Sequence, residues 1–327
     1  MYTRIMVPTD CSGFDRNAIR VALRIAEQSG AEIRLVRVLT SGAYFGAGEA
    51  TSREEPSVES IRRERRRALT ELYALASECR RASSVTVTVA LESGPVVDAL
   101  EHYAKHHGVD LIVISSHGRG GISRLALGSV TDSLVRRTKI PVLVVKPTAS
   151  YLDPEARGVF RKIVVPLDGS PLAEQILEPV MTLAVLDEAQ VALLTVLHRE
   201  KSANGPQPPL EWWDRGVAAA RAYLARVAER LRVGRIRVVT EVVLGDNVAD
   251  EIAAYAGSED ADLVAIATHG RGGLVRVLRG SVADAVTRGA RTSILVFHPA
   301  QADRKAERTI DLRHVNQSQR LSRTPSR

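Results

Sequence analysis

The stretch SHGRGGISRLALGS, residues 116–129, is repeated as THGRGGLVRVLRGS at residues 268–281. The two copies keep HGRGG, an arginine and a final Gly-Ser in register. A second pair repeats as well, because RIMVPTDCS at residues 4–12 returns as KIVVPLDGS at residues 162–170. Repetition of several segments in the same order indicates a tandem duplication of one structural unit.

The bulk composition agrees with two globular domains. The chain has 327 residues, 45% of them hydrophobic and 25% charged, and about 150 residues is a usual domain size. We place the first domain at residues 1–150 and the second at 157–300, around the boundary stretch PTASYLDPEARG. Residues 301–327 carry seven Lys or Arg against three Asp or Glu. With few large apolar residues, this segment is predicted to be a basic, disordered tail.

The charge and the apolar runs limit the classes of partner. The tail accounts for four of the seven net positive charges. The first 300 residues therefore carry a net charge of only +3, too small to indicate nucleic acid as a partner. No apolar run approaches the ~20 residues of a membrane span, and the start MYTRIMVPTD lacks the layout of a signal peptide. Cys11 and Cys79 form no CxxC pair, which agrees with a reducing compartment. We therefore expect a cytoplasmic protein with no membrane association.

Each copy alternates short apolar runs with amphipathic segments. In the first copy, strand patterns cover residues 4–8, 32–39, 84–91, 110–115 and 140–146, and helical spacing covers residues 15–30, 60–81, 94–108 and 129–139. Five strands interleaved with four helices predict an α/β fold, with a doubly wound, open, five-stranded parallel sheet in each domain and helices on both faces. The arginines within residues 62–67 predict the solvated face of a helix.

The glycine segments follow an apolar strand and lead into a helix. In an open parallel sheet, ligands bind at the carboxyl ends of the strands, where the strand order reverses. Glycine allows the main chain to approach a ligand closely, and Gly128-Ser129 places backbone N–H groups at a helix N-terminus, which favours anions. The spacing is neither the P-loop GxxxxGK[ST] nor GxGxxG. We expect the ligand to carry a phosphate chain.

Taken together, these segments resemble the universal stress proteins over nearly all of residues 1–300. The nucleotide-binding members of that family carry a G-x2-G-x9-G-[ST] pattern after the fourth strand of a five-stranded α/β fold. The matching positions are Ser115, Gly118, Gly128 and Ser129 in the first copy and Ala267, Gly270, Gly280 and Ser281 in the second. The first glycine of the pattern is thus replaced in both copies, each time by a small residue.

The resemblance also implies contacts with a nucleoside. The family's aspartate after strand one corresponds to Asp10 and Asp168, and its valine after strand two, which meets the base, corresponds to Val38 and Val196. The expected ATP-binding set is completed by Arg119 and Arg271, which directly follow a glycine, and by Val130 and Val282, which follow the final serine of each pattern.

Most of these positions have a structural alternative. Ser129 and Asp132 have the spacing of a capping box, as do Ser281 and Asp284. The aspartates at positions 10 and 168 are also placed to cap the first helix or to hold the turn after the proline. The arginines at positions 119 and 271 are equally suited to be solvated loop cations. Cys11 would sense oxidants only with a stabilised thiolate, and the second copy has glycine at that place.

The resemblance implies an ATP-binding regulator of the stress response, with one nucleotide and its Mg²⁺ in each domain and no catalytic residue. One alternative is a slow ATP-hydrolysing enzyme, although the motif supplies neither a Walker lysine nor a positioned base. Another is a nucleotide-free protein-interaction module. The family pairs domains through the last strand, so residues 140–146 and 292–298 are expected to pair within the chain. A homodimer and an unidentified regulatory protein are further expected partners.

Overall fold

The computed structural model describes residues 1–40, 57–116, 128–146, 158–198, 210–232, 234–267 and 292–298. The chain divides into two compact units, one formed by most of residues 2–147 and the other by most of the residues from 148 onward. The tail at 301–327, the boundary residues 147–157 and most of both glycine segments lie outside the described residues.

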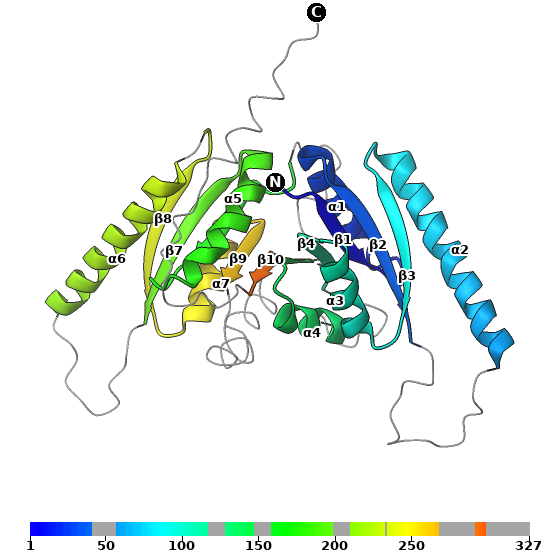
Figure 1. Cartoon of the computed structure of the whole chain (residues 1–327). Helices are drawn as coiled ribbons and strands as arrows, with labels where there is room; N and C mark the ends of the chain where they lie inside the picture. The colour runs from blue at the N-terminus through cyan, green and yellow to red at the C-terminus, as the bar shows by residue number, and fades with distance from the viewer. Residues whose placement is uncertain are drawn as a thin grey trace, which may run out of the picture. The chain divides into compact units, whose positions relative to one another are not determined.

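The first unit is an open parallel sheet with the strand order β3-β2-β1-β4-β5. Its elements are β1 (Arg4–Pro8), α1 (Arg16–Ser29), β2 (Glu32–Leu39), α2 (Val58–Ala82), β3 (Val87–Ser93), α3 (Val96–His106), β4 (Leu111–Ser115), α4 (Ser129–Arg137) and β5 (Val142–Val145). The predicted alternation of five strands and four helices is confirmed (Figure 1).

The second unit repeats this order as β8-β7-β6-β9-β10. Its elements are β6 (Lys162–Pro166), the short 3₁₀ helix η3 (Ala173–Ile176), α5 (Leu177–Asp187), β7 (Gln190–His198), α6 (Leu210–Leu231), β8 (Val238–Gly245), α7 (Val248–Ser258), β9 (Leu263–Ala267) and β10 (Ser293–Phe297). Both units therefore have the predicted α/β class.

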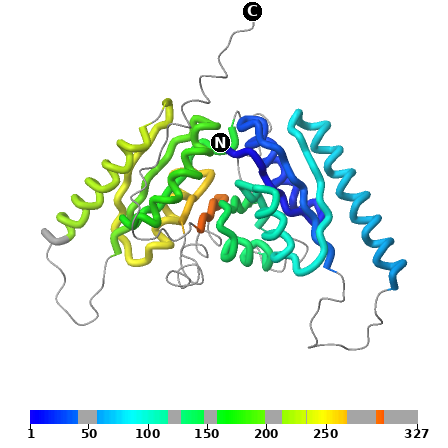
Figure 2. Tube along the Cα trace, in the orientation of Figure 1, coloured from blue at the N-terminus to red at the C-terminus, as the bar shows by residue number. Residues whose placement is uncertain are grey.

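Helices cover both faces of the first sheet because the crossovers run outward on one face and return on the other. Helix α1 packs on β1, β2 and β4 and α2 packs on β2 and β3, whereas α3 and α4 contact each other on the opposite face. The long helices α2 (25 residues) and α6 (22 residues) run beside the outer strands β3 and β8 (Figure 2). The arginines in the first turns of α2 are exposed, which confirms the predicted solvated face.

One aspartate in each unit fastens the first strand to the fourth. Asp110, just before β4, accepts hydrogen bonds from the backbone N–H groups of Thr3 at 2.7 Å and Arg4 at 3.1 Å. Asp262, just before β9, accepts from the N–H groups of Arg161 at 2.7 Å and Lys162 at 3.1 Å. These backbone donors at the amino edge of each sheet would otherwise lack a partner in the strand ladder.

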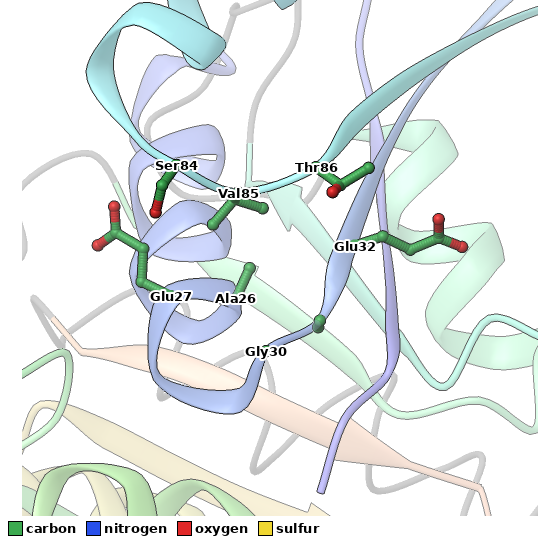
Figure 3. A pocket seen from close by; sticks show the side chains of 8 residues that line it. Ala26, Glu27, Gly30, Glu32, Ser84, Val85 and Thr86 are labelled. Carbon is green, nitrogen blue, oxygen red and sulfur yellow. The ribbon is translucent and has the colours of Figure 1, made fainter. Parts of the chain in front are cut away.

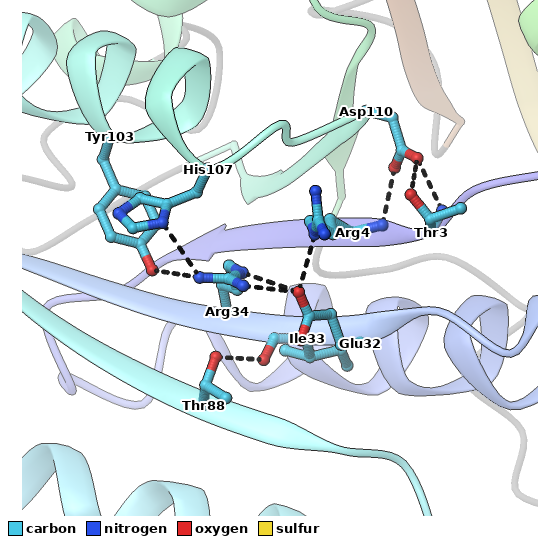
Figure 4. A network of polar contacts seen from close by, with 9 residues as sticks. All are labelled: Thr3, Arg4, Glu32, Ile33, Arg34, Thr88, Tyr103, His107 and Asp110. Carbon is cyan, nitrogen blue, oxygen red and sulfur yellow. Dashed lines mark hydrogen bonds and ion pairs between the residues drawn. The ribbon is translucent and has the colours of Figure 1, made fainter.

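A charged network surrounds the same edge of the first unit (Figure 4). Arg34 of β2 donates to Glu32 at 2.6 Å, to the Tyr103 hydroxyl at 3.3 Å and to His107 Nδ1 at 3.3 Å. Glu32 also accepts from Arg4 at 3.1 Å. The pKa of Glu32 is lowered, first by its hydrogen bond to Arg34. This network ties β1, β2 and α3 together at the amino edge.

Candidate functional site

The carboxyl ends of β1 and β4 lie side by side where the strand order reverses. Strand β1 pairs with β2 on one side and with β4 on the other, and the register places Met6 opposite Ile112. The second unit has the same reversal, with Val164 of β6 opposite Val264 of β9. Ligands bind at this kind of crevice in open parallel sheets, so these ends define the candidate site.

Asp10 and Asp168 form the same turn at the end of the first strand of each unit. The Ser12 N–H donates to Asp10 Oδ1 at 2.9 Å, and the Ser170 N–H donates to Asp168 Oδ1 at 2.9 Å. Neither aspartate caps the following helix, because α1 has Asp15 as its N-cap and η3 has Leu172. The turn-holding role is therefore confirmed and the capping alternative is wrong.

The residue after each aspartate has a left-handed backbone. Cys11 has φ 58°, and Gly169 at the equivalent place has φ 84°. The first unit maintains this conformation with a residue other than glycine, and the Thr9 hydroxyl accepts a hydrogen bond from the Cys11 N–H at 2.9 Å. Thr9 in turn donates to the buried carboxylate of Asp15. This chain of contacts fixes the turn that presents Asp10.

Two hydrogen bonds fasten the N-terminus of α4 to the end of β4. The Gly128 N–H donates to the Ser116 carbonyl at 2.9 Å, and the Thr131 hydroxyl donates to the Ser115 carbonyl at 3.0 Å. The first turn of α4 therefore lies at the carboxyl edge of the sheet, at the end of the strand that pairs with β1.

The same geometry contradicts the capping box that the spacing of Ser129 and Asp132 offered as an alternative. The N-cap of α4 is Gly128, which has no side chain to cap with, and Ser129 is the first helical residue. Asp132 instead accepts from Arg136 at 2.7 Å. The first intrahelical bond runs from the Asp132 N–H to the Gly128 carbonyl at 2.9 Å, so the amides of Ser129 and Val130 precede the helical bonding pattern.

Val38 and Val196 lie near the carboxyl ends of β2 and β7, and both are half-buried. In the first unit, Asp10 and Ser115 are likewise partly buried, and Ser129 is exposed. In the second unit, Ala267 ends β9 and Asp168 is exposed. The remaining predicted positions lie outside the described residues: Gly118, Arg119, Gly270, Arg271, Gly280, Ser281 and Val282.

The thiol of Cys11 is not activated. Burial is the largest influence and raises its pKa, outweighing the contact with the Thr9 hydroxyl and the charge of Arg37. A raised pKa disfavours the thiolate, the form that reacts with oxidants. The described contacts of Cys11 therefore do not supply the stabilised thiolate that the oxidant-sensor alternative requires.

The described residues also contain a hollow of about 270 Å³ that lies elsewhere (Figure 3). It is bounded by the end of α1 and the starts of β2 and β3, with Gly30, Glu32 and Thr86 among its lining residues. These are amino ends of strands, so the hollow is at the edge opposite Asp10. Within the described ranges, no His, Cys, Asp or Glu side chains gather in threes to form a metal site.

Comparison with known proteins identifies the family. The sequence model of the universal stress protein family matches residues 1–146 and again 160–298. The chain belongs to the universal stress protein family. Its two matched segments make it a tandem, two-domain universal stress protein.

Several relatives of this universal stress protein are known. Universal stress protein Rv2005c of Mycobacterium tuberculosis is 33% identical over 192 residues, which span 57% of this chain and 61% of that protein. The match thus covers about three-fifths of that relative's length. A universal stress protein of Mycolicibacterium smegmatis is 27% identical over 308 residues, 90% of this chain and 97% of the relative. A universal stress protein structure from Archaeoglobus fulgidus has the same fold, with a TM-score of 0.66 at 16% identity and coverage of 92% and 97%.

Several residues that build the sheet edges were not predicted from the sequence. Thr131 anchors α4, but the second copy has Ala283 at that place, so the repeat gives no signal for it. Asp110 and Asp262 were detectable, because both precede the fourth strand of their copies in the same frame. In the part of the chain that the structure describes, no helix is long and apolar enough to cross a membrane.

Proposed function

We propose that this universal stress protein binds ATP at the carboxyl edge of each sheet and acts as a nucleotide-dependent regulator in the stress response. The observation that carries the proposal is the attachment of the α4 N-terminus to the end of β4, the strand that pairs with β1. The carboxyl end of β1 leads to the turn that presents Asp10. Backbone amides and a carboxylate acceptor then face the same edge, at the point where the strand order reverses.

The phosphate chain would lie against the first turn of α4. The amides of Ser129 and Val130 precede the intrahelical bonds, and the positive end of the helix dipole favours an anion there. The glycine segment, with Gly118 and Arg119, would cover the other side of the phosphates. The N–H of Gly128 is donated to Ser116. Gly128 would therefore contribute by letting the main chain come close to the phosphates, because it has no side chain.

The nucleoside would lie over the ends of β1 and β2. One oxygen of Asp10 holds the Ser12 N–H, and the carboxylate would also accept from a ribose hydroxyl or the base edge. Val38, half-buried near the end of β2, offers an apolar contact for adenine. Asp168 and Val196 have the corresponding places in the second unit.

Mg²⁺ would arrive with the nucleotide and neutralise the charge of its phosphates. This ion usually keeps several waters and binds through substrate phosphates with few protein carboxylates. This coordination preference of Mg²⁺ is compatible with a sheet edge that offers main-chain amides and a single aspartate. Nucleotide binding would then order the surface of the loop and helix that a regulatory protein reads.

Mass spectrometry of small molecules released by heat from freshly purified protein tests the proposal. We expect adenine nucleotide in the supernatant and a rise in Tm on adding MgATP, because a ligand of the native state stabilises it. Absence of both signals would contradict the proposal and favour a nucleotide-free interaction module. Phosphate release while the purified protein is incubated with MgATP would identify slow hydrolysis instead of simple retention.

A further inference from the structure

Two histidines lie one turn apart on the solvent-facing side of α3. His102 and His106 are four residues apart in this helix, which places them on the same face, and both are exposed. Their ring centroids are 3.9 Å apart with an angle of 33° between the ring planes. The two imidazoles therefore already lie together at the surface.

One of these rings has its hydrogen position fixed by the backbone. His106 Nδ1 lies 2.8 Å from the carbonyl oxygen of His102. A carbonyl oxygen can only accept, so Nδ1 donates and the Nε2 of neutral His106 has a lone pair. Metal-binding histidines are commonly held in this way, with the other ring nitrogen donating to a carbonyl or carboxylate.

The position on the helix also favours a cation. His106 is the last residue of α3, and the C-terminal end of a helix carries partial negative charge. The exposed ammonium of Lys105 opposes this effect, while Arg137 is engaged by Asp98 at 2.5 Å and Glu101 at 2.7 Å. Affinity would thus come mainly from the two imidazoles.

We propose that His102 and His106 form a surface site for a divalent transition metal such as Ni²⁺, Cu²⁺ or Zn²⁺. Imidazole suits these ions, whereas Mg²⁺ prefers oxygen ligands. Because the described residues bring no third ligand of this kind, water completes the coordination. The second unit has Ala254 and Ser258 at the equivalent places, so we expect this site once per chain. It lies where α3 leads into β4, at the amino edge of the sheet, and so is separate from the proposed nucleotide site.

Calorimetric titration of the untagged full-length protein with Ni²⁺ alone tests the site. We expect His102→Gln and His106→Gln each to lose the binding event or to weaken it about tenfold or more, since each removes half of the chelate. His198→Gln is the matched control, because His198 is an exposed histidine in the other unit. The control should bind as the unmodified chain does.

Thermal melts give a second measurement. Ni²⁺ should raise the Tm of the unmodified chain and of His198→Gln, because it binds the folded helix. At the same Ni²⁺ concentration, the Tm of the two α3 variants should rise less or not at all. Melts without metal should coincide, since both side chains are exposed. Unaltered Ni²⁺ affinity in both α3 variants would overturn the proposal. Millimolar Mg²⁺ that displaces Ni²⁺ would overturn the assigned metal class.

Discussion

At the residue scale, Asp10 has a structural role and a proposed binding role, and one substitution separates them. Asparagine keeps the oxygen that accepts from the Ser12 N–H but replaces the second carboxylate oxygen with an amide donor. We predict that Asp10→Asn leaves the Tm of the nucleotide-free protein nearly unchanged. Its affinity for MgATP in the first domain should fall about tenfold, the usual effect of losing a hydrogen bond to a charged group.

Calorimetry on Asp10→Asn, Asp168→Asn and the double variant would measure this effect one domain at a time. Asp10→Ala serves as the control for the turn, because it removes both oxygens and should lower the Tm even without nucleotide. If Asp10→Asn binds MgATP as tightly as the unmodified chain, the aspartate only holds the turn.

The left-handed backbone of the turn after Asp168 can be tested by a second substitution at the residue scale. Gly169 has φ 84°, and an added Cβ there would meet nothing within 4 Å. Gly169→Ala should therefore lower the free energy of unfolding by about 1 kcal/mol through the left-handed backbone alone. Gly257→Ala is the matched control, since Gly257 lies in α7 and also has open space around its Cβ position.

The control should move in the opposite direction. Alanine is favoured over glycine inside a helix by about 0.5–1 kcal/mol, so Gly257→Ala should raise the free energy of unfolding. Urea denaturation of both variants measures the difference, and a shift of the same sign in both would refute the backbone explanation. Cys11 occupies the left-handed position in the first unit with a side chain, supported by the Thr9 hydroxyl.

At the element scale, the N-terminus of α4 allows an amide to be removed without breaking the helix. Ser129 is the first helical residue, a position where proline is favoured, and Gly128 has φ −58° and ψ 149°, which suits a residue before proline. We predict that Ser129→Pro keeps its fold and Tm but binds MgATP in the first domain about tenfold or more weakly, because the Ser129 N–H is gone.

Ser129→Ala is the matched variant, since it loses the hydroxyl and keeps the amide. It should retain more affinity than the proline variant, as measured by titration with MgATP. Unchanged binding by Ser129→Pro would show that the phosphates do not use this end of α4.

The aspartates that fasten the first strand to the fourth allow a prediction about stability. The side chain of Asp262 is 0% exposed and accepts from two backbone N–H groups. Asp262→Ala should cost about 2–3 kcal/mol, because buried donors are left without partners. Asp110→Ala should cost less, since its site is more exposed and water can replace the carboxylate. Urea denaturation of the two variants compares them, and equal losses would contradict the role of burial.

The same elements show how far the sequence predicts this fold. Amphipathic spacing correctly predicts α1, and the glycine after it does end the helix, with φ 73° at Gly30. Strand patterns likewise predict a parallel sheet covered on both faces, because apolar runs such as β4 are buried. Periodicity in the sequence predicts a helix or strand correctly where the burial of each residue is set by the element to which it belongs.

Prediction is weaker where a partner comes from a distant element. The spacing of Ser129 and Asp132 suggests a capping box, but Gly128 takes the N-cap because its N–H bonds to Ser116 at the end of β4. The contacts of Asp110 with the start of β1 depend on the register of two strands over 100 residues apart. No local pattern contains that register.

At the scale of the whole molecule, the two copies share a frame but differ around their aspartates. In the first unit, Arg37 of β2 donates to Glu71 of α2 at 2.7 Å, and this contact is the largest cause of the lowered pKa of Glu71. In the second unit, the equivalent place on α6 is Tyr223, whose pKa is raised by burial and then by the charges of Glu174 and Asp168. The two proposed sites thus have different electrostatic surroundings, and nucleotide affinities measured for the two domains are expected to differ.

The duplication also leads to a prediction about the two halves as separate proteins. Each half contains a complete five-stranded order, so residues 1–150 and 157–300 should each fold when expressed alone. Within its own unit's order, β5 or β10 is the last strand and has an apolar sequence. An edge strand of this kind tends to pair with another strand. The resemblance to the family implies that the last strand of one half pairs with the last strand of the other. We predict that mixing the halves gives a one-to-one complex in size-exclusion chromatography with light scattering. Circular dichroism of each half alone would confirm folding first, and two folded halves that stay separate would show that the last strands do not join them.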